Sequence, residues 1–210
     1  MKKFYVFDMD GTITDSMCQF SQGVAQVLGG LNINCSDKII REVTPLGLVK
    51  TAEYFIDKLG VTESVESLVN ILEKTLCQTY QSVRLKPFAK EYLEKIYNQG
   101  GRLYILTANH PSVARVTLKN NGIESLFEGV LSVFDFGATK SEVKLYELLV
   151  EKLVCNKEDL VYFDDSPIAV STAMRAGLDT FGIEDRQSQE DKQLIKKLCT
   201  KYVRSYTEIL

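Results

Sequence analysis

Short apolar runs that end abruptly in polar residues recur along this 210-residue chain and decide which folds are open to it. Amphipathic helical patterns of about ten residues separate the runs, and this alternation is typical of an α/β fold with a parallel sheet and right-handed crossovers. The predicted strands are Phe4–Phe7, Arg102–Leu106, Val130–Val133, Leu160–Phe163 and, more weakly, Thr180–Ile183. The predicted helices are Phe88–Ile96, Pro111–Asn121, Glu142–Leu153 and Pro167–Ala176.

Residues 15–82 break this alternation, since they contain helical patterns but no convincing strand. Ser16 to Gln19 predicts a capping box at the start of a helix. A block of this length is too large for an ordinary loop. We therefore predict a small helical cap domain at 15–82, inserted into a core of residues 1–14 and 83–210. Its two clearest apolar stripes are Leu48, Ala52, Phe55, Ile56 and Leu59, and Val65, Leu68, Val69, Leu72 and Leu76.

Acidic residues gather at the ends of two predicted strands. Asp8 and Asp10 follow the first run, and because side chains alternate along a strand they can point the same way. Asp164 and Asp165 end another run. Carboxylates held together repel one another unless a cation or a shared proton relieves them. If these strands are neighbours, the all-oxygen cluster favours Mg²⁺ over zinc.

Two further strand or helix ends carry groups suited to an anion. Thr107, Ala108 and Asn109 precede a helix that begins at Pro111, and free N–H groups at a helix start beside a hydroxyl bind anions. The alternative is that Thr107 merely caps the helix. Lys140 precedes another predicted helix, and its point charge suits a phosphate or an aspartyl oxyanion. The alternative is a solvated surface lysine.

The composition narrows the class of protein. A net charge of −3 argues against a nucleic-acid partner. No apolar stretch approaches the roughly 20 residues that span a bilayer, and the N-terminal run is too short for a signal peptide. The single histidine, His110, excludes a multi-histidine zinc site. Five scattered cysteines without a CxxC pair favour free thiols in a reducing cytoplasm. We expect a cytoplasmic protein, monomeric or weakly dimeric, without a membrane partner.

Taken in order, Asp8-x-Asp10-Gly11-Thr12, Thr107, Lys140 and Asp164-Asp165 resemble the four motifs of the haloacid dehalogenase superfamily of phosphotransferases. The helical insert and the stretch from Phe163 to Pro167 resemble its branch of phosphoglycolate phosphatases and β-phosphoglucomutases. The resemblance implies a Rossmann-like core with a helical cap.

The chain departs from the family pattern in two places. The family lysine is usually followed by prolines, where this chain has Ser141 and Val143, so Lys144 is an alternative to Lys140. The branch often has glycine in place of Asp164 and a second acid in place of Ala169, which makes Asp165 the safer metal ligand.

The resemblance also implies roles for these residues. Asp8 would form an aspartyl phosphate, and Asp10 would act as acid and then as base. Thr107 and Lys140 would assist, and the cap would select the substrate through Arg41 to Lys50, with Thr44-Pro45-Leu46-Gly47 at its centre. The phosphate-binding residues would be Gly11, Thr12, Ala108, Asn109 and Lys140. The Mg²⁺ ligands would be Asp8, Asp10, Asp164 and Asp165, with Asp10 contributing its carbonyl.

The expected function is a Mg²⁺-dependent phosphatase that hydrolyses a small-molecule phosphate monoester. The first alternative is a phosphosugar mutase, which would return the phosphoryl group to a sugar. The second is a non-catalytic binding protein, which would be expected to have lost Asp8, Asp10 or Asp165.

Overall fold

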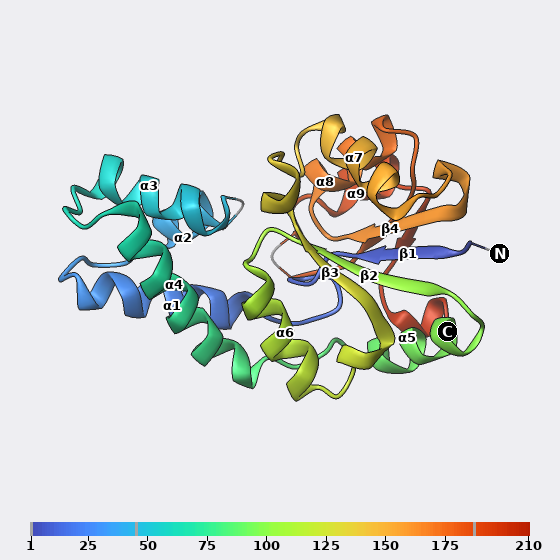
Figure 1. Cartoon of the computed structure of the whole chain (residues 1–210), viewed down its shortest axis with the longest axis horizontal. Coiled ribbons are helices and arrows are strands. Elements are labelled where there is room, and N and C mark those ends of the chain that lie inside the picture. Colours follow the sequence, from blue (N-terminus) through green and yellow to red (C-terminus); the bar gives the residue numbers. More distant parts are fainter. Residues whose placement is uncertain (1, 45, 187) are drawn as a thin grey trace.

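A computed structural model describes residues 2–44, 46–186 and 188–210 of the chain, and its centre is a six-stranded parallel sheet (Figure 1). The strand order is β3-β2-β1-β4-β5-β6, which confirms the predicted α/β fold. Successive strands run outward from β1 on both sides, so a crevice is expected beyond its carboxyl end. The strands are β1 (Phe4–Phe7), β2 (Arg102–Thr107), β3 (Phe127–Ser132), β4 (Leu160–Asp164), β5 (Asp179–Ile183) and β6 (Lys201–Val203).

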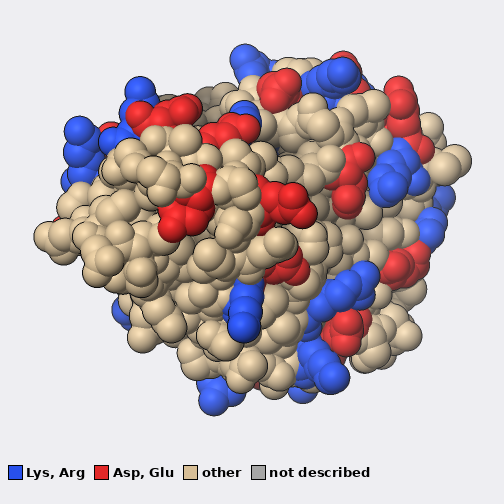
Figure 2. Space-filling model, turned by 60° about the vertical axis from the view of Figure 1, so that its left-hand side comes forward, with Lys and Arg blue, Asp and Glu red and all other residues tan. Residues whose placement is uncertain are grey.

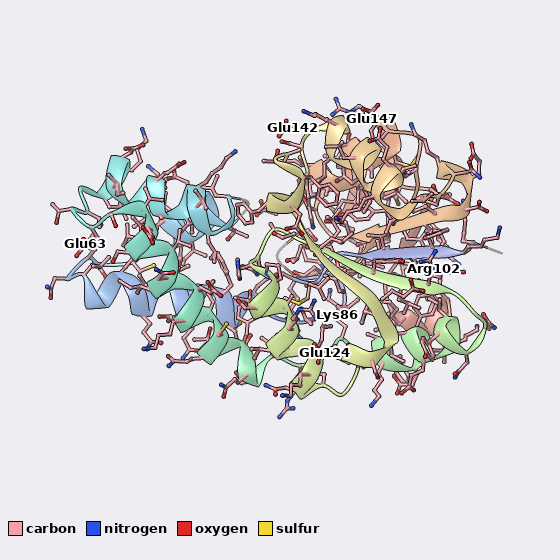
Figure 3. The ribbon with its side chains drawn as sticks, in the orientation of Figure 1. Glu63, Lys86, Arg102, Glu124, Glu142 and Glu147 are labelled. Carbon is pink, nitrogen blue, oxygen red and sulfur yellow. The ribbon has the colours of Figure 1, made fainter. Side chains whose placement is uncertain are left out.

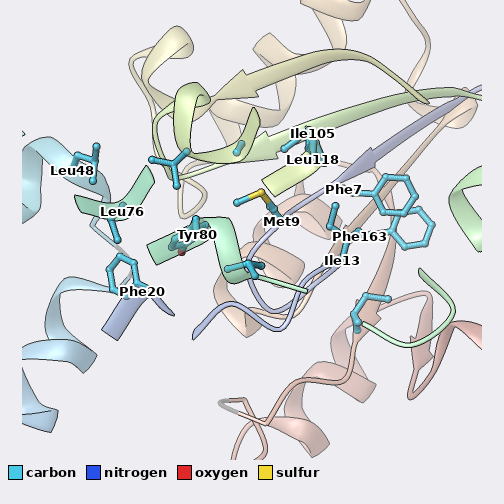
Figure 4. Packing of buried hydrophobic residues seen from close by; sticks show 14 of the residues in the cluster. Phe7, Met9, Ile13, Phe20, Leu48, Leu76, Tyr80, Ile105, Leu118 and Phe163 are labelled. Carbon is cyan, nitrogen blue, oxygen red and sulfur yellow. The ribbon is translucent and has the colours of Figure 1, made fainter. Parts of the chain in front are cut away.

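Alternation along the strands sends side chains to two helical layers. Val6 and Tyr162 belong to a buried cluster with α7 (Val143–Leu153) and α8 (Pro167–Arg175). Phe7 and Phe163 belong to a cluster with α5 (Ala89–Asn98) and α6 (Pro111–Asn120), and their rings stack at 4.3 Å between centroids (Figure 4). Burying one such ring contributes about 1.5–3 kcal/mol. By the same alternation, Asp8 and Asp164 continue the face toward α7 and α8.

The helical insert lies beside one end of the sheet (Figure 1). Its helix α4 packs against α1 and α3, and the predicted apolar stripes of α3 and α4 supply their buried faces. Glu63, between α3 and α4, lies at the end of the insert farthest from the sheet (Figure 3). The insert consists of α1 (Met17–Gly30), α2 (Asp37–Val43), α3 (Gly47–Leu59), α4 (Val65–Thr79) and the short 3-10 helix η1 (Tyr80–Ser82).

The two segments that join the insert to the sheet are paired with each other. Thr14 and Leu85 form an antiparallel bridge, and the Lys86 N–H donates to the Ile13 carbonyl at 2.9 Å. The Lys86 ammonium pairs with Asp185 at 2.9 Å, near the middle of the molecule (Figure 3). Because both crossings lie here, we propose the boundaries of the cap at residues 15 and 82.

The capping box predicted at Ser16 is wrong. Ser16 occupies the N-cap position of α1, but its side chain makes no capping hydrogen bond. Its hydroxyl donates to the Asp10 carboxylate at 2.5 Å instead. A charged acceptor makes a stronger hydrogen bond than a neutral one, so the carboxylate outcompetes the helix end.

The C-terminal part of the chain holds elements that the sequence did not suggest. Helix α9 (Lys192–Leu198) packs against α8, and β6 extends the sheet beyond β5. The remaining short 3-10 helices are η2 (Glu124–Leu126), η3 (Val133–Phe136), η4 (Lys157–Asp159) and η5 (Tyr206–Glu208).

The distribution of charged side chains and the state of the cysteines agree with what the composition predicts. Acidic and basic side chains are interspersed on the face shown in Figure 2, without a continuous basic area. All five cysteines are free thiols. Within the described residues, no helix combines the length and apolarity needed to cross a membrane.

Val154 is strained at the end of α7. Its φ of 49° and ψ of 53° are left-handed, which costs a residue with a Cβ about 1–2 kcal/mol. Its side chain is 89% exposed and packs little. We expect Val154→Gly to raise the free energy of unfolding by about 1 kcal/mol in urea denaturation. Val49→Gly, a control within helix α3, should lower it by about 0.5 kcal/mol. An unchanged or lowered stability of Val154→Gly would contradict the strain.

Candidate active site

The first predicted motif forms a tight turn at the carboxyl end of β1. The Asp8 N–H donates to the Phe163 carbonyl at 2.8 Å, which continues the β1–β4 pairing by one residue. Gly11 has a φ of 81°, and a Cβ there would lie 2.6 Å from an oxygen of Asp165. The turn therefore brings two acidic segments together that are far apart in the sequence, and it requires glycine to do so.

Three carboxylates meet at this point. Asp8, Asp164 and Asp165 each offer an oxygen within 4.8 Å of the others. Burial raises the pKa of Asp8 to about 7, with Lys140 opposing the shift. Burial, followed by the charges of Asp164 and Asp8, raises the pKa of Asp165 well above its usual value. Ionising all three costs free energy unless a cation compensates, and a set of hard oxygen donors fits Mg²⁺.

Lys140 lies among these acids. Its ammonium contacts Asp8 and bonds to Asp164 at 2.9 Å. Burial alone would lower the pKa of Lys140, but Asp164 and Asp8 hold it above its ordinary value, so the lysine is charged. The Tyr146 hydroxyl fixes its backbone by donating to the Lys140 carbonyl at 3.1 Å. Lys144 is exposed on α7. The geometry thus favours Lys140 over Lys144.

The Asp164 carboxylate is already well supplied with donors. Besides Lys140, it accepts hydrogen bonds from the Tyr162 hydroxyl and, at 2.8 Å, from the Ser166 N–H. Asp165 accepts one from the Thr12 hydroxyl at 3.1 Å and is partly exposed. Of these two acids, Asp165 has the more available oxygens.

The Asp10 carboxylate points away from the acid cluster and toward the insert. It accepts hydrogen bonds from Ser16 at 2.5 Å, Tyr80 at 2.9 Å and Asn109 at 2.7 Å. Burial raises the pKa of Asp10, and these three bonds oppose the rise. The Asp10 side chain is therefore not part of the group of carboxylates formed by Asp8, Asp164 and Asp165.

The other predicted phosphate-binding residues divide into two groups. Ala108 and Asn109 line a cavity beside the acids, and the Asn109 N–H also donates to the Thr107 hydroxyl at 3.0 Å. Thr107 and Thr12 are fully buried and do not line it. The Thr12 carbonyl accepts a hydrogen bond from Tyr206 at 3.1 Å, which makes this turn part of the packed core.

The cavity, of about 480 Å³, lies between the sheet and the helical insert. Lys50 lines it and Arg41 does not, so the structure separates the two cations of the expected specificity segment. Thr44, Leu46 and Gly47 of that segment also line it, while Pro45 lies outside the described residues. His110 is the N-cap residue of α6 and does not line the cavity, and its Nδ1 lies 3.0 Å from Glu73.

Sequence reasoning did not find Tyr80, Ser16 and Tyr162 as site residues. All three are buried and bond to a site carboxylate. Tyr162 could have been suspected, since it lies two positions before Asp164 on the same side of a strand. Tyr80 carries no such signal, because it lies 70 residues after Asp10 in the sequence, at the C-terminal end of the insert.

Comparison with known proteins agrees with this geometry. The family model of the haloacid dehalogenase-like hydrolases matches residues 5–183. The chain belongs to the haloacid dehalogenase-like hydrolases. This confirms the family and the enzyme class expected from the motifs.

Several relatives of this hydrolase that match over most of its length are named phosphatases. "Phosphatase MT3486" of Mycobacterium tuberculosis is 26% identical over 93% of both chains. A phosphoglycolate phosphatase of Vibrio parahaemolyticus is 22% identical, over 86% of this chain and 83% of the relative. The crystal structure of CbbY from Rhodobacter sphaeroides in complex with phosphate has a TM-score of 0.88 at 15% identity, covering 100% and 96% of the two chains. The last likeness concerns the fold.

Proposed function

We propose that this haloacid dehalogenase-like hydrolase is a Mg²⁺-dependent phosphatase that hydrolyses a small-molecule phosphate monoester through a phosphorylated Asp8. The observation that carries the proposal is the position of Asp8 itself. It lies at the carboxyl end of β1, within contact of a charged lysine and beside two further carboxylates, and it lines a cavity. A buried carboxylate in such surroundings suits nucleophilic attack on a phosphoryl group.

Asp8 and Lys140 supply the first step. An oxygen of Asp8 attacks phosphorus, and the bond from phosphorus to the leaving oxygen breaks. Lys140 neutralises charge on the phosphoryl oxygens, and Asp164 holds the lysine in place through the 2.9 Å bond. Asp8, Asp165 and the Asp10 carbonyl would hold Mg²⁺, which would orient the phosphate and offset negative charge during transfer.

Asp10 serves both halves of the reaction. Asp10 lies two residues beyond Asp8 and lines the same cavity, so a leaving group in the cavity would lie near it. In the first half, Asp10 gives a proton to the leaving alcohol. In the second, it takes a proton from water, whose oxygen attacks phosphorus and releases Asp8.

The lining of the cavity suggests the class of substrate. Met17, Phe20 and Leu46 of the insert provide apolar contacts, and Lys50 adds a cation. A volume of about 480 Å³ suits a small molecule. The name of the Vibrio relative makes phosphoglycolate one reasonable candidate. The predicted cytoplasmic location and the predicted monomeric or weakly dimeric state are retained as proposals.

A panel of monoesters tests the function. The purified protein with Mg²⁺ is given p-nitrophenyl phosphate, glycerol 3-phosphate, phosphoglycolate and several sugar phosphates. We expect steady release of inorganic phosphate without any bisphosphorylated primer. Conversion of glucose 1-phosphate to glucose 6-phosphate faster than phosphate release would instead establish the mutase, which must shield its phosphoenzyme from water.

Lys50 should govern selectivity between substrates. If it contacts an anionic group on the leaving alcohol, Lys50→Ala should lower kcat/KM about fivefold for monoesters that carry a second anion, as expected for an exposed ion pair. Monoesters with a neutral leaving group should change less than about twofold. Arg41→Ala is the matched control, since Arg41 is exposed and does not line the cavity. Equal effects of Lys50→Ala on both classes would contradict this role.

A further inference from the structure

Three side chains from separate parts of the chain converge on the Asp10 carboxylate. Asn109 comes from the loop after β2, Ser16 from the start of α1 and Tyr80 from η1 at the end of the insert. We propose that Tyr80 is a positioning residue, which with Ser16 and Asn109 aims the Asp10 carboxylate at the leaving group. This inference rests on the proposed function.

The hydrogen bonds leave the carboxylate little freedom to rotate. Asn109 donates to one oxygen at 2.7 Å, and Tyr80 donates to the other at 2.9 Å. The Asn109 amide also donates to the Tyr80 hydroxyl at 3.3 Å, which closes a ring of three groups. Ser16 adds a third bond, at 2.5 Å, on the oxygen that Tyr80 uses. Both oxygens are thus oriented, and rotation of the carboxylate would break at least two bonds at once.

Tyr80 is itself rigidly held. The side chain is fully buried and lies between Phe20 and Leu76 of the insert and Met9 of the first motif (Figure 4). The Thr117 hydroxyl donates to its backbone carbonyl at 3.4 Å, which ties η1 to α6. A ring packed on several sides presents its hydroxyl in one place, so the hydroxyl can define the position of another group.

The three donors to the Asp10 carboxylate come from two parts of the molecule, the insert and the core. Ser16 lies at the start of the insert and Tyr80 in its last turn, so two of the three donors belong to the insert, while Asn109 belongs to the core, in the loop after β2. The full set of bonds therefore forms when the insert is seated as in this structure. The seated insert also closes the cavity through Met17 and Phe20.

A positioning role in proton transfer can be separated from a structural one by the choice of leaving group. When the bond from phosphorus to the leaving oxygen breaks, Asp10 transfers its proton to that oxygen as the bond to Asp8 forms. An alkoxide requires this proton, whereas p-nitrophenolate is stable without it. If the Asp10 carboxylate is no longer held toward the leaving group, hydrolysis of alkyl phosphates should therefore slow more than hydrolysis of p-nitrophenyl phosphate.

The experiment compares kcat/KM of Tyr80→Phe and wild type on two substrates. They are p-nitrophenyl phosphate and the alkyl monoester that wild type hydrolyses fastest. We expect kcat/KM of the variant to fall about 10–100-fold on the alkyl ester and less than about threefold on the aryl ester. The loss on the alkyl ester is part of the rate enhancement that a general acid provides. Ser16→Ala, a smaller change, should give the same pattern to a lesser extent. It keeps the inference testable if Tyr80→Phe does not fold.

Tyr206→Phe is the matched control. It also removes one hydroxyl from a fully packed tyrosine, one that bonds to the Thr12 carbonyl instead of Asp10. Its effect should be the same on both substrates. Equal losses of Tyr80→Phe on the two esters, or no loss on either, would overturn the positioning role while leaving the phosphatase intact. Failure of wild type to hydrolyse either ester would overturn the proposed function and this inference with it.

Discussion

Asp8→Asn is expected to lower kcat at least about 1,000-fold, the scale of losing a group that acts in the transition state. The substitution preserves shape but replaces the attacking oxygen of a carboxylate with a poorly nucleophilic amide. Asp8 is 5% exposed, and its carboxylate contacts the Lys140 ammonium. The fold should survive, because burial of the charged carboxylate is itself unfavourable, as its raised pKa of about 7 indicates.

The measurement is the rate of phosphate release, together with a thermal unfolding curve to show that the variant is folded. Asp179→Asn is a suitable control, since Asp179 begins β5 at the opposite end of the sheet and pairs with Lys2 at 3.2 Å. It should keep activity within about twofold. Retention of a tenth of the wild-type rate by Asp8→Asn would rule out Asp8 as the nucleophile.

Removal of divalent metal is the second large effect. In excess chelator the enzyme should lose all measurable phosphatase activity, and Mg²⁺ should restore it. Mg²⁺ should also raise the melting temperature, because a cation bound only by the folded state stabilises it by about 2.7 kcal/mol at 100 times its Kd. For a chain of this size that corresponds to roughly 5–10 °C. Ca²⁺ should restore activity poorly, since it prefers more ligands and a looser geometry.

The same thermal measurement tests whether the Asp165 carboxylate is a metal ligand. Asp165→Asn should remove most of the Mg²⁺-induced rise in melting temperature, while Asp57→Asn, an exposed position on α3, should keep it. Full activity in excess chelator would contradict the metal site. A normal thermal shift in Asp165→Asn would exclude Asp165 as a ligand.

The sequence predicted the fold well where the pattern is strong. Strands β1, β2 and β4 bury nearly every residue, so they appear as apolar runs in the sequence. Strand β6 has three residues, and α9 buries Ile195 alone among its described residues, so neither produces a clear period. The stability of short elements at the edge of a sheet depends on the residues that they pack against. Those contacts cannot be predicted from the local sequence.

Part of the active site could also be predicted, because its position follows from the strands that the sequence shows clearly. Parallel strands place their carboxyl ends at one edge, which is why Asp8, Asp164 and Asp165 could be expected to meet. The partners of Asp10 could not be expected, because Ser16 and Tyr80 reach it through the packing of the insert. Thr12 was predicted to bind the phosphate, and the sequence did not indicate that its hydroxyl would donate to Asp165 or that its carbonyl would accept a hydrogen bond from Tyr206.

The phosphorylated Asp8 can be sought directly. The enzyme is mixed with Mg²⁺ and a monoester that carries radioactive phosphorus in its phosphoryl group, and the reaction is quenched in acid within one turnover. One portion of the protein is counted for bound label. A second portion is treated with borohydride, which reduces an acyl phosphate to an alcohol and releases the phosphate. We predict label on the wild-type protein, none on Asp8→Asn, and conversion of Asp8 to homoserine in the peptide identified by mass spectrometry. Label on another residue, or turnover without any labelled protein at the earliest quench times, would contradict catalysis through Asp8.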